Sequence, residues 1–364
     1  MWGAIAARTF ADNSACAVRA IFGYPDGMAD YRVGIVGCTG MGKYHAQAYR
    51  TLDRCEVVAV CDRKIDRAAS LAAELGDDGP AIAVRDDYRR MLDTDKPDLI
   101  SVCTSDDQHA DVVVDAAEAG VRGICCEKPI ATTLADADRM IAAVTEAGVA
   151  MNIEHTRRYW PAFQEARQML ADGAIGPPSR IIATLSGPRA MLFRNGTHTI
   201  DMMRFLVGGE PRWVLAHLQD GFEGYDRYLG DGGHDEGTEP DLVGYVVFDH
   251  GVRGIYNGVK AGPLGSSWEV FGPRGRLVLT DYAMAVYRDR FKLEHDRTLG
   301  RPDTGDACRT AATELIGMIE HGGPCISTPA DARTTLQIIL AFLQSQKQGC
   351  TPVPIDRGTS SPQT

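Results

Sequence analysis

The feature that most constrains the fold of this chain is a series of short apolar runs between residues 31 and 154, separated by segments with helical spacing. Runs that are apolar along their whole length are typical of strands covered on both faces, and strands that alternate with helices are typical of a parallel sheet. The sequence therefore predicts a doubly wound parallel α/β domain over residues 30–154. Its expected strands are 33–36, 57–61, 81–84, 99–103, 123–126 and 149–154.

The pattern changes after residue 155. A helix expected over 161–171 is followed by strand-like segments in series, which favours an antiparallel or mixed sheet. The sequence thus predicts a second α/β domain over residues 155–356. Residues 1–29 are interpreted as an N-terminal arm that is not essential, and residues 357–364 as a polar, disordered tail.

The charge balance and the cysteines limit the partners and the compartment. The chain has 38 basic and 49 acidic side chains, a net charge of −11, so no nucleic-acid partner is expected. No stretch approaches the ~20 apolar residues that cross a bilayer, so no membrane partner is expected either. The ten cysteines lack C-x-x-C spacing, and several fall in apolar runs. They are interpreted as reduced thiols of a cytoplasmic protein that has no metal site.

A glycine-rich turn follows the first predicted strand. Its residues, Gly37-Cys38-Thr39-Gly40-Met41-Gly42, match the pattern G-x-G-x-x-G except that Thr39 replaces the second glycine. Between a strand and a helix this pattern is typical of a dinucleotide site, although such a turn can also simply close a strand–helix unit. Asp62 ends the second strand, where a carboxylate can accept hydrogen bonds from ribose hydroxyls and repel a 2′-phosphate. NAD(H) is therefore favoured, and Arg63 keeps NADP(H) as the alternative.

Three further motifs accompany this turn, which is itself followed by His45. Residues 101–109 are similar to T-P-N-x-x-H with Ser105 and Asp106 in place of Pro and Asn, residues 127–129 read Glu-Lys-Pro, and residues 196–201 fit G-x-H-x-x-D. Together these motifs resemble the Gfo/Idh/MocA family of glucose–fructose oxidoreductases and inositol dehydrogenases. The resemblance covers about residues 31–356.

The resemblance implies a Rossmann domain for the cofactor and a C-terminal α/β domain with a large, mostly antiparallel sheet, which binds substrate and supports a homodimer or homotetramer. It also implies that the substrate lies between the two domains, over the nicotinamide. The residues it implies for cofactor binding are Gly37, Thr39, Gly40, Met41, Gly42, Asp62, Arg63, Thr104, Ser105, His109, Glu127 and Lys128.

Lys128 and His198 are the expected catalytic residues. Lys128 leaves a strand at its carboxyl end, where ligands bind in open α/β sheets, and its ammonium group could stabilise a substrate alkoxide. An unperturbed histidine titrates near neutrality, so His198 could act as the general acid/base that moves the hydroxyl proton. A surface lysine and a structural histidine are the alternatives for these two residues.

Arg157, Tyr159, Arg194 and Asp201 are expected to bind the substrate. Arg194 stands where the family often has Asp, so the usual Lys–Asp–His set is incomplete, and fixed cations here would suit an anionic group on the substrate. The arginines could instead pair with acids of the long segment 220–241. Asp201 could instead orient His198 or have a purely structural role.

The function favoured by these residues is an NAD(P)-dependent oxidoreductase that interconverts a secondary alcohol and a ketone on a sugar, cyclitol or sugar acid. Two alternatives remain open on sequence alone. One is an NAD-dependent, redox-assisted glycosidase or lyase of the same fold, and the other is a regulator that binds a dinucleotide without turnover.

Overall fold

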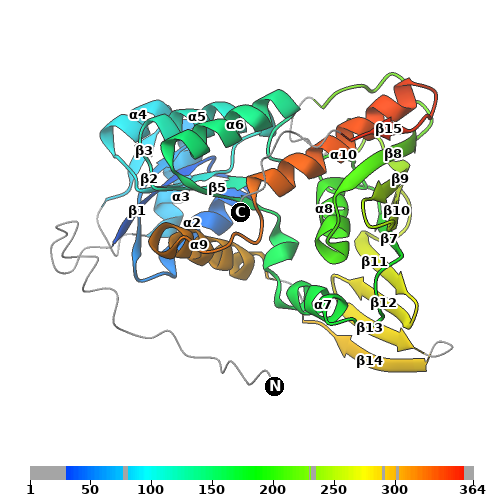
Figure 1. Cartoon of the computed structure of the whole chain (residues 1–364). Coiled ribbons are helices and arrows are strands. Elements are labelled where there is room, and N and C mark those ends of the chain that lie inside the picture. The colour runs from blue at the N-terminus through cyan, green and yellow to red at the C-terminus, as the bar shows by residue number, and fades with distance from the viewer. Residues whose placement is uncertain are drawn as a thin grey trace.

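The computed structural model describes residues 30–76, 81–228, 230, 235–288, 292–300 and 303–355. The interpretations given above for residues 1–29 and 357–364 lie outside these residues. Figure 1 shows two lobes, one built around a sheet that carries the first strands of the chain and one built around a longer sheet.

The first lobe contains the predicted doubly wound sheet. Its six strands run parallel in the order β3-β2-β1-β4-β5-β6, so the expected fold class is confirmed. Both faces are covered, which explains why these strands are apolar throughout. The strands are β1 (Tyr31–Val36), β2 (Cys55–Cys61), β3 (Ala83–Arg85), β4 (Leu99–Val102), β5 (Gly123–Glu127) and β6 (Ala150–Glu154).

Helices cover the two faces of this sheet. The helices α2, α3 and α9 pack on one face, and α4, α5 and α6 pack on the other. The helix α9 (Thr304–His321) belongs by sequence to the second domain, yet it lies on β5 and β6 and buries Leu315 and Ile316 with the core of the first lobe. The others are α2 (Met41–Arg50), α3 (Ile65–Leu75), α4 (Tyr88–Thr94), α5 (His109–Glu118) and α6 (Leu134–Ala147).

The second lobe contains a nine-stranded sheet in which every neighbouring pair is antiparallel except β7 and β10. Its strands alternate buried and exposed residues because helices cover only one face. The sequence predicted six of these strands and missed the last three. The strands are β7 (Arg180–Ser186), β8 (Pro211–Leu218), β9 (Leu242–Phe248), β10 (Arg253–Val259), β11 (Gly265–Gly272), β12 (Gly275–Thr280), β13 (Ala283–Arg288), β14 (Lys292–Thr298) and β15 (Val353–Pro354).

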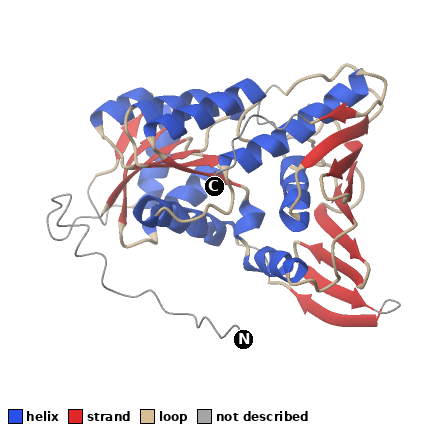
Figure 2. Cartoon of the chain, in the orientation of Figure 1, coloured by secondary structure: helices blue, strands red, loops and turns tan. Residues whose placement is uncertain are grey.

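Three helices line the inner face of this longer sheet, as Figure 2 shows by their colour against the strands. They are α7 (Pro161–Ala171), α8 (Gly196–Val207) and α10 (Pro329–Lys347). The helix α10 also contacts α6 of the first lobe, so both C-terminal helices tie the two lobes together. In the described part of the chain, no helix combines the length and apolar character that a bilayer crossing requires.

The packing of α9 against the first lobe can be tested by truncating Leu315, which is fully buried beside Gly123 of β5. We expect Leu315→Ala to lower the free energy of unfolding by about 2–5 kcal/mol, because a cavity opens under the parallel sheet. The measurement is the urea midpoint followed by circular dichroism. Thr313→Ala, on the exposed side of the same helix, is the control, and equal midpoints for the two variants would contradict the assignment.

Candidate active site

The glycine-rich turn between β1 and α2 depends on its glycines for steric reasons. Gly37 has φ +93°, and a Cβ there would lie 2.2 Å from the carbonyl oxygen of Cys103. A Cβ on Gly42 would lie 1.8 Å from the carbonyl oxygen of Gly37, and Gly40 has φ +53°. The chain can therefore turn sharply from β1 into α2, which begins at Met41, and leave the start of that helix open to a ligand.

A cavity of about 260 Å³ opens at the carboxyl ends of β1, β2 and β4. This edge is where parallel α/β sheets bind nucleotides. The Thr104 hydroxyl lines the cavity and is buried without a hydrogen-bond partner among the described residues, as expected for a group that pairs with a ligand. Six of the predicted cofactor residues line it: Gly37, Thr39, Asp62, Arg63, Thr104 and Ser105.

The Asp62 carboxylate organises one wall of this cavity. One oxygen accepts a hydrogen bond from the backbone N–H of Cys38 at 3.1 Å, and the other accepts from that of Lys64 at 3.0 Å. Lys64 and Arg67 line the same cavity beside Arg63, and neither was predicted from the sequence. Their position in the first turn after Asp62 was the available signal, because that turn must face the same edge of the sheet.

His109 and Glu127 lie beneath the edge of the sheet rather than in the cavity. The His109 ring nitrogens lie 3.0 Å from the carbonyl oxygen of Pro129 and 3.3 Å from that of Thr104, so this ring joins two turns. The buried Glu127 accepts a hydrogen bond from the backbone N–H of Lys128 at 3.2 Å. Both residues hold the Lys128–Pro129 turn, in which the peptide bond is cis.

Lys128 reaches from the first lobe to the second. Its Nζ donates a hydrogen bond of 3.0 Å to the carbonyl oxygen of Arg194, just before α8. Burial lowers the pKa of Lys128, and the Arg194 cation lowers it further, whereas Glu127 and Asp106 oppose that shift. The ammonium group is thus held in a confined place where its charge has a strong electrostatic effect.

His198, in the first turn of α8, lies within electrostatic reach of Lys128. Burial lowers the pKa of His198 well below its usual value, and the charges of Lys128, Arg157 and Arg194 act in the same direction. Its Nδ1 is buried without a partner among the described residues. The imidazole is therefore neutral at neutral pH and can accept a proton.

The two arginines expected at the substrate differ in their environment. Arg157 is held by Asp281, with its Nε and Nη2 donating at 2.8 and 2.9 Å, so its charge is already paired. Asp281 lies outside the segment 220–241, so Arg157 is not paired with an acid of that segment, as the alternative had proposed. Among the described residues the Arg194 guanidinium has no ion pair.

Tyr159 and Asp201 both have buried hydrogen-bond partners within the fold, and their contact with substrate stays a prediction. The Tyr159 hydroxyl donates to Glu314 at 2.9 Å. The Asp201 carboxylate accepts two hydrogen bonds from Arg158, at 2.7 and 2.8 Å. Both side chains are almost fully buried, and their contacts fix η2 (Thr156–Tyr159) and α8.

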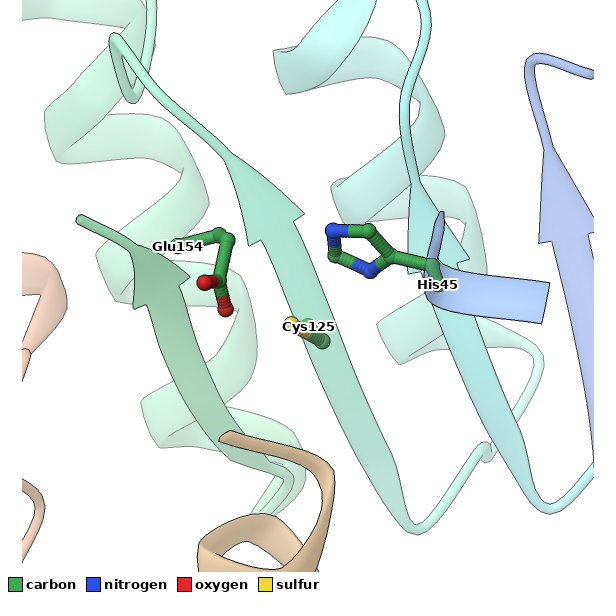
Figure 3. A group of neighbouring side chains, drawn as sticks. All are labelled: His45, Cys125 and Glu154. Atoms are coloured by element: carbon green, nitrogen blue, oxygen red, sulfur yellow. The ribbon is translucent and has the colours of Figure 1, made fainter. Parts of the chain in front are cut away.

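Three buried polar side chains, His45, Cys125 and Glu154, form a cluster within the first lobe. Figure 3 shows the side chains of His45, Cys125 and Glu154 pointing toward one another from α2, β5 and β6. The three ligand atoms lie within 4.8 Å of one another. Both nitrogens of His45 already have partners, Ser101 at 2.9 Å and Glu127 at 3.2 Å.

Glu154 is the unusual member of this group. It is fully buried, and neither carboxylate oxygen has a hydrogen-bond partner among the described residues. Burial raises the pKa of Glu154 well above its usual value, and the charges of Glu127 and Glu314 raise it further. We therefore interpret Glu154 as a neutral carboxylic acid in the core rather than as a metal ligand.

Comparisons with known proteins agree with this architecture. A family model described as "Oxidoreductase family, NAD-binding Rossmann fold" matches residues 31–155, and a GFO/IDH/MocA C-terminal domain matches residues 163–278. Together the two models cover well over half of the chain. The chain therefore belongs to the Gfo/Idh/MocA oxidoreductase family, as its motifs indicated.

Curated relatives include a D-apiose dehydrogenase of Paraburkholderia graminis, 33% identical over 51% of this chain and 52% of that protein. A myo-inositol 2-dehydrogenase of Thermotoga maritima is 28% identical over 68% of this chain and 74% of that protein. A D-glucoside 3-dehydrogenase of Escherichia coli is 34% identical over 49% and 54%, respectively. For most of these relatives the chain matches about half of their length.

Solved structures show the same fold over nearly the whole chain. An NAD binding oxidoreductase from Klebsiella pneumoniae aligns with a TM-score of 0.75 and 22% identity, covering 90% of this chain and 100% of that one. A levoglucosan dehydrogenase, solved in complex with NADH and levoglucosan, aligns with a TM-score of 0.75 and 22% identity, covering 90% and 99%. At these identities the likeness establishes the fold alone.

The neutral state of Glu154 gives a testable pH dependence. The folded protein keeps this proton at pH values where the unfolded chain has released it, so stability falls as the pH rises above about 4.3, by up to about 1.4 kcal/mol per pH unit. We expect Glu154→Gln to remove this loss, so that the variant gains stability over wild type between pH 5 and pH 8.

The measurement is urea unfolding at a series of pH values. Glu118→Gln, at an exposed position near the end of α5, is the control and should follow the wild type. A Glu154→Gln curve parallel to that of the wild type would mean that Glu154 is ionised in the folded protein.

Proposed function

We propose that this protein is an NAD(P)-dependent dehydrogenase that interconverts a secondary alcohol and a ketone on a sugar, cyclitol or sugar acid. The observation that carries the proposal is the hydrogen bond from the Lys128 ammonium, at the carboxyl end of β5, to the Arg194 carbonyl just before α8, the helix that carries the buried His198. The names of the apiose, inositol and glucoside dehydrogenases among the relatives support the substrate class.

The residues at the turn and the cavity fit a dinucleotide. At Gly37 and Gly42 a Cβ would collide with the backbone. The buried Thr104 hydroxyl has no hydrogen-bond partner among the described residues, so it is available to a ligand. Bound NAD(P)⁺ would supply the hydride acceptor for the carbinol carbon. The start of α2 would face the pyrophosphate, and Asp62 would face the adenosine ribose.

Lys128 and His198 would have different roles at the substrate hydroxyl: Lys128 would stabilise the negative charge on the oxygen, and His198 would accept the proton. The Lys128 ammonium donates to a backbone carbonyl in this structure, and a substrate oxygen can take one of its remaining protons. As negative charge builds on that oxygen, the fixed cation stabilises it. The neutral His198 accepts the hydroxyl proton and returns it in the reverse reaction.

Arg194 favours the anionic members of this substrate class. Its guanidinium has no ion pair among the described residues, and its backbone carbonyl touches Lys128. A carboxylate on the substrate could form a bidentate pair with it. Arg157 is less suited because Asp281 already holds its charge.

The role of Lys128 is tested by replacing it with methionine, which keeps the side-chain length without the charge. We expect Lys128→Met to lower turnover about a hundredfold to a thousandfold because the alkoxide loses its donor, while NAD⁺ still binds. Reduced nicotinamide is followed by absorbance over a panel of inositols, aldoses and aldonates. Lys292→Met, at an exposed position of β14, is the control.

Two outcomes of this assay would overturn parts of the proposal. Full turnover by Lys128→Met would remove Lys128 from the mechanism. Cleavage of glycosides without net NADH formation would favour the redox-assisted glycosidase or lyase instead.

The choice of NAD(H) over NADP(H) rests on Asp62, whose negative charge in the cavity opposes a 2′-phosphate, although Arg63, Lys64 and Arg67 would attract one. We expect Asp62→Asn to shift the ratio of dissociation constants about tenfold toward NADP⁺, because the repulsion disappears while an amide oxygen remains. Titration calorimetry with both coenzymes measures the ratio. Asp66→Asn, an exposed residue of α3 outside the cavity, is the control, and an unchanged ratio in Asp62→Asn would refute this role.

A further inference from the structure

The segment between β8 and β9 touches the cofactor-binding lobe through one side chain. The Tyr228 hydroxyl donates a short hydrogen bond to Oδ2 of Asp106, which begins the single turn η1 (Asp106–Gln108) after β4. Both side chains are about 95% buried. The backbone at Gly230 is so close to the same turn that a Cβ there would lie 2.8 Å from the backbone nitrogen of Asp107.

The ring of Tyr228 is fixed from its other side. It stacks on Phe193, with the ring centroids 4.3 Å apart and the planes 4° from parallel. Glu239, near the end of the same segment, accepts hydrogen bonds from the backbone N–H groups of Phe193, at 2.5 Å, and Arg194, at 3.2 Å. The segment therefore fixes the backbone of Phe193 and Arg194, and the Arg194 carbonyl accepts the hydrogen bond from the Lys128 ammonium.

Titratable groups from several elements act on Lys128. Arg194 and His198 come from the second lobe, Glu127 precedes it on β5, Asp106 comes from η1, and Glu239 comes from the segment after β8. Arg194 lowers the pKa of Lys128, while Glu127, Asp106 and Glu239 raise it. Contacts also link Asp106 to the Lys128 site: Tyr228, which bonds Asp106, stacks on Phe193. Phe193 directly precedes Arg194, whose carbonyl accepts the Lys128 hydrogen bond.

We propose that Asp106 and Tyr228 are a pair of positioning residues: the Asp106 charge offsets Arg194 beside the Lys128 ammonium, and the Tyr228 hydrogen bond fixes the segment 219–228 to the cofactor-binding lobe. The consequence for catalysis rests on the function proposed above. The hydrogen bond and the charge effect do not depend on that function, and each can be measured in the absence of substrate turnover.

The charge effect is tested by acylating lysine amines at a series of pH values and following Lys128 by mass spectrometry, which gives the titration midpoint of that amine. In Asp106→Asn we expect this midpoint to fall by about one pH unit, because a nearby negative charge is lost while Arg194 remains. The exposed neighbour Asp107 provides the control Asp107→Asn, which should leave the midpoint unchanged.

The hydrogen bond is tested with Tyr228→Phe, which keeps the stacked ring and removes only the hydroxyl. We expect amide hydrogen exchange in residues 219–228 to become about tenfold faster or more, because a buried hydrogen bond to a charged acceptor is lost. The Lys128 midpoint should stay within the range of the wild type, since the Asp106 charge is retained.

Two results would overturn the proposal, whether or not the protein turns over any sugar. One is a Lys128 midpoint in Asp106→Asn equal to that in Asp107→Asn, which would show that the Asp106 charge does not act on the amine. The other is unchanged exchange of residues 219–228 in Tyr228→Phe, which would show that the bond does not hold the segment.

Discussion

The arrangement of this active site depends on one hydrogen bond between the lobes, from the Lys128 ammonium to the carbonyl oxygen of Arg194. A charged amine in a confined place is unfavourable unless polar groups surround it. The structure supplies such groups from both sides, with Glu127 and Asp106 on the cofactor lobe and Glu239 holding the backbone of Arg194 on the other. The same confinement removes the proton from His198, so a fixed cation and a neutral base stand together.

Buried ion pairs and backbone contacts around this pair determine which side chains remain available for chemistry. Asp201 is fully engaged by Arg158, and Asp331 bonds both Arg158 and Arg204, which links η2, α8 and α10. Truncating one partner of such a network would leave an uncompensated buried charge, so these contacts hold the second lobe in shape. Arg194 is left beside Lys128 without a carboxylate of its own among the described residues, which is the observation behind the proposal of an anionic substrate.

Much of this could be predicted from sequence because the signals were local. The apolar runs gave the parallel strands of the first lobe within a few residues of their ends, and alternation gave six strands of the second sheet. The strand β14 was missed because it reads Lys-Leu-Glu-His-Asp-Arg-Thr and is exposed along most of its length, so it carries no apolar alternation. The buried partners of Tyr159 and Asp201, Glu314 and Arg158, could not be predicted because proximity along a chain does not fix which way a side chain points.

The sequence by itself determined the doubly wound first domain, the family and the glycine-rich turn between β1 and α2. These features depend on periodicity and on residues close together in the chain. Only the tertiary structure decided that α9 covers the first sheet and that Tyr228 bonds Asp106, which is 122 residues away in the chain. The physical reason is that the burial of a residue and the electrostatic field around it each depend on the combined effect of side chains from separate elements. That combined effect exists only after the chain has folded.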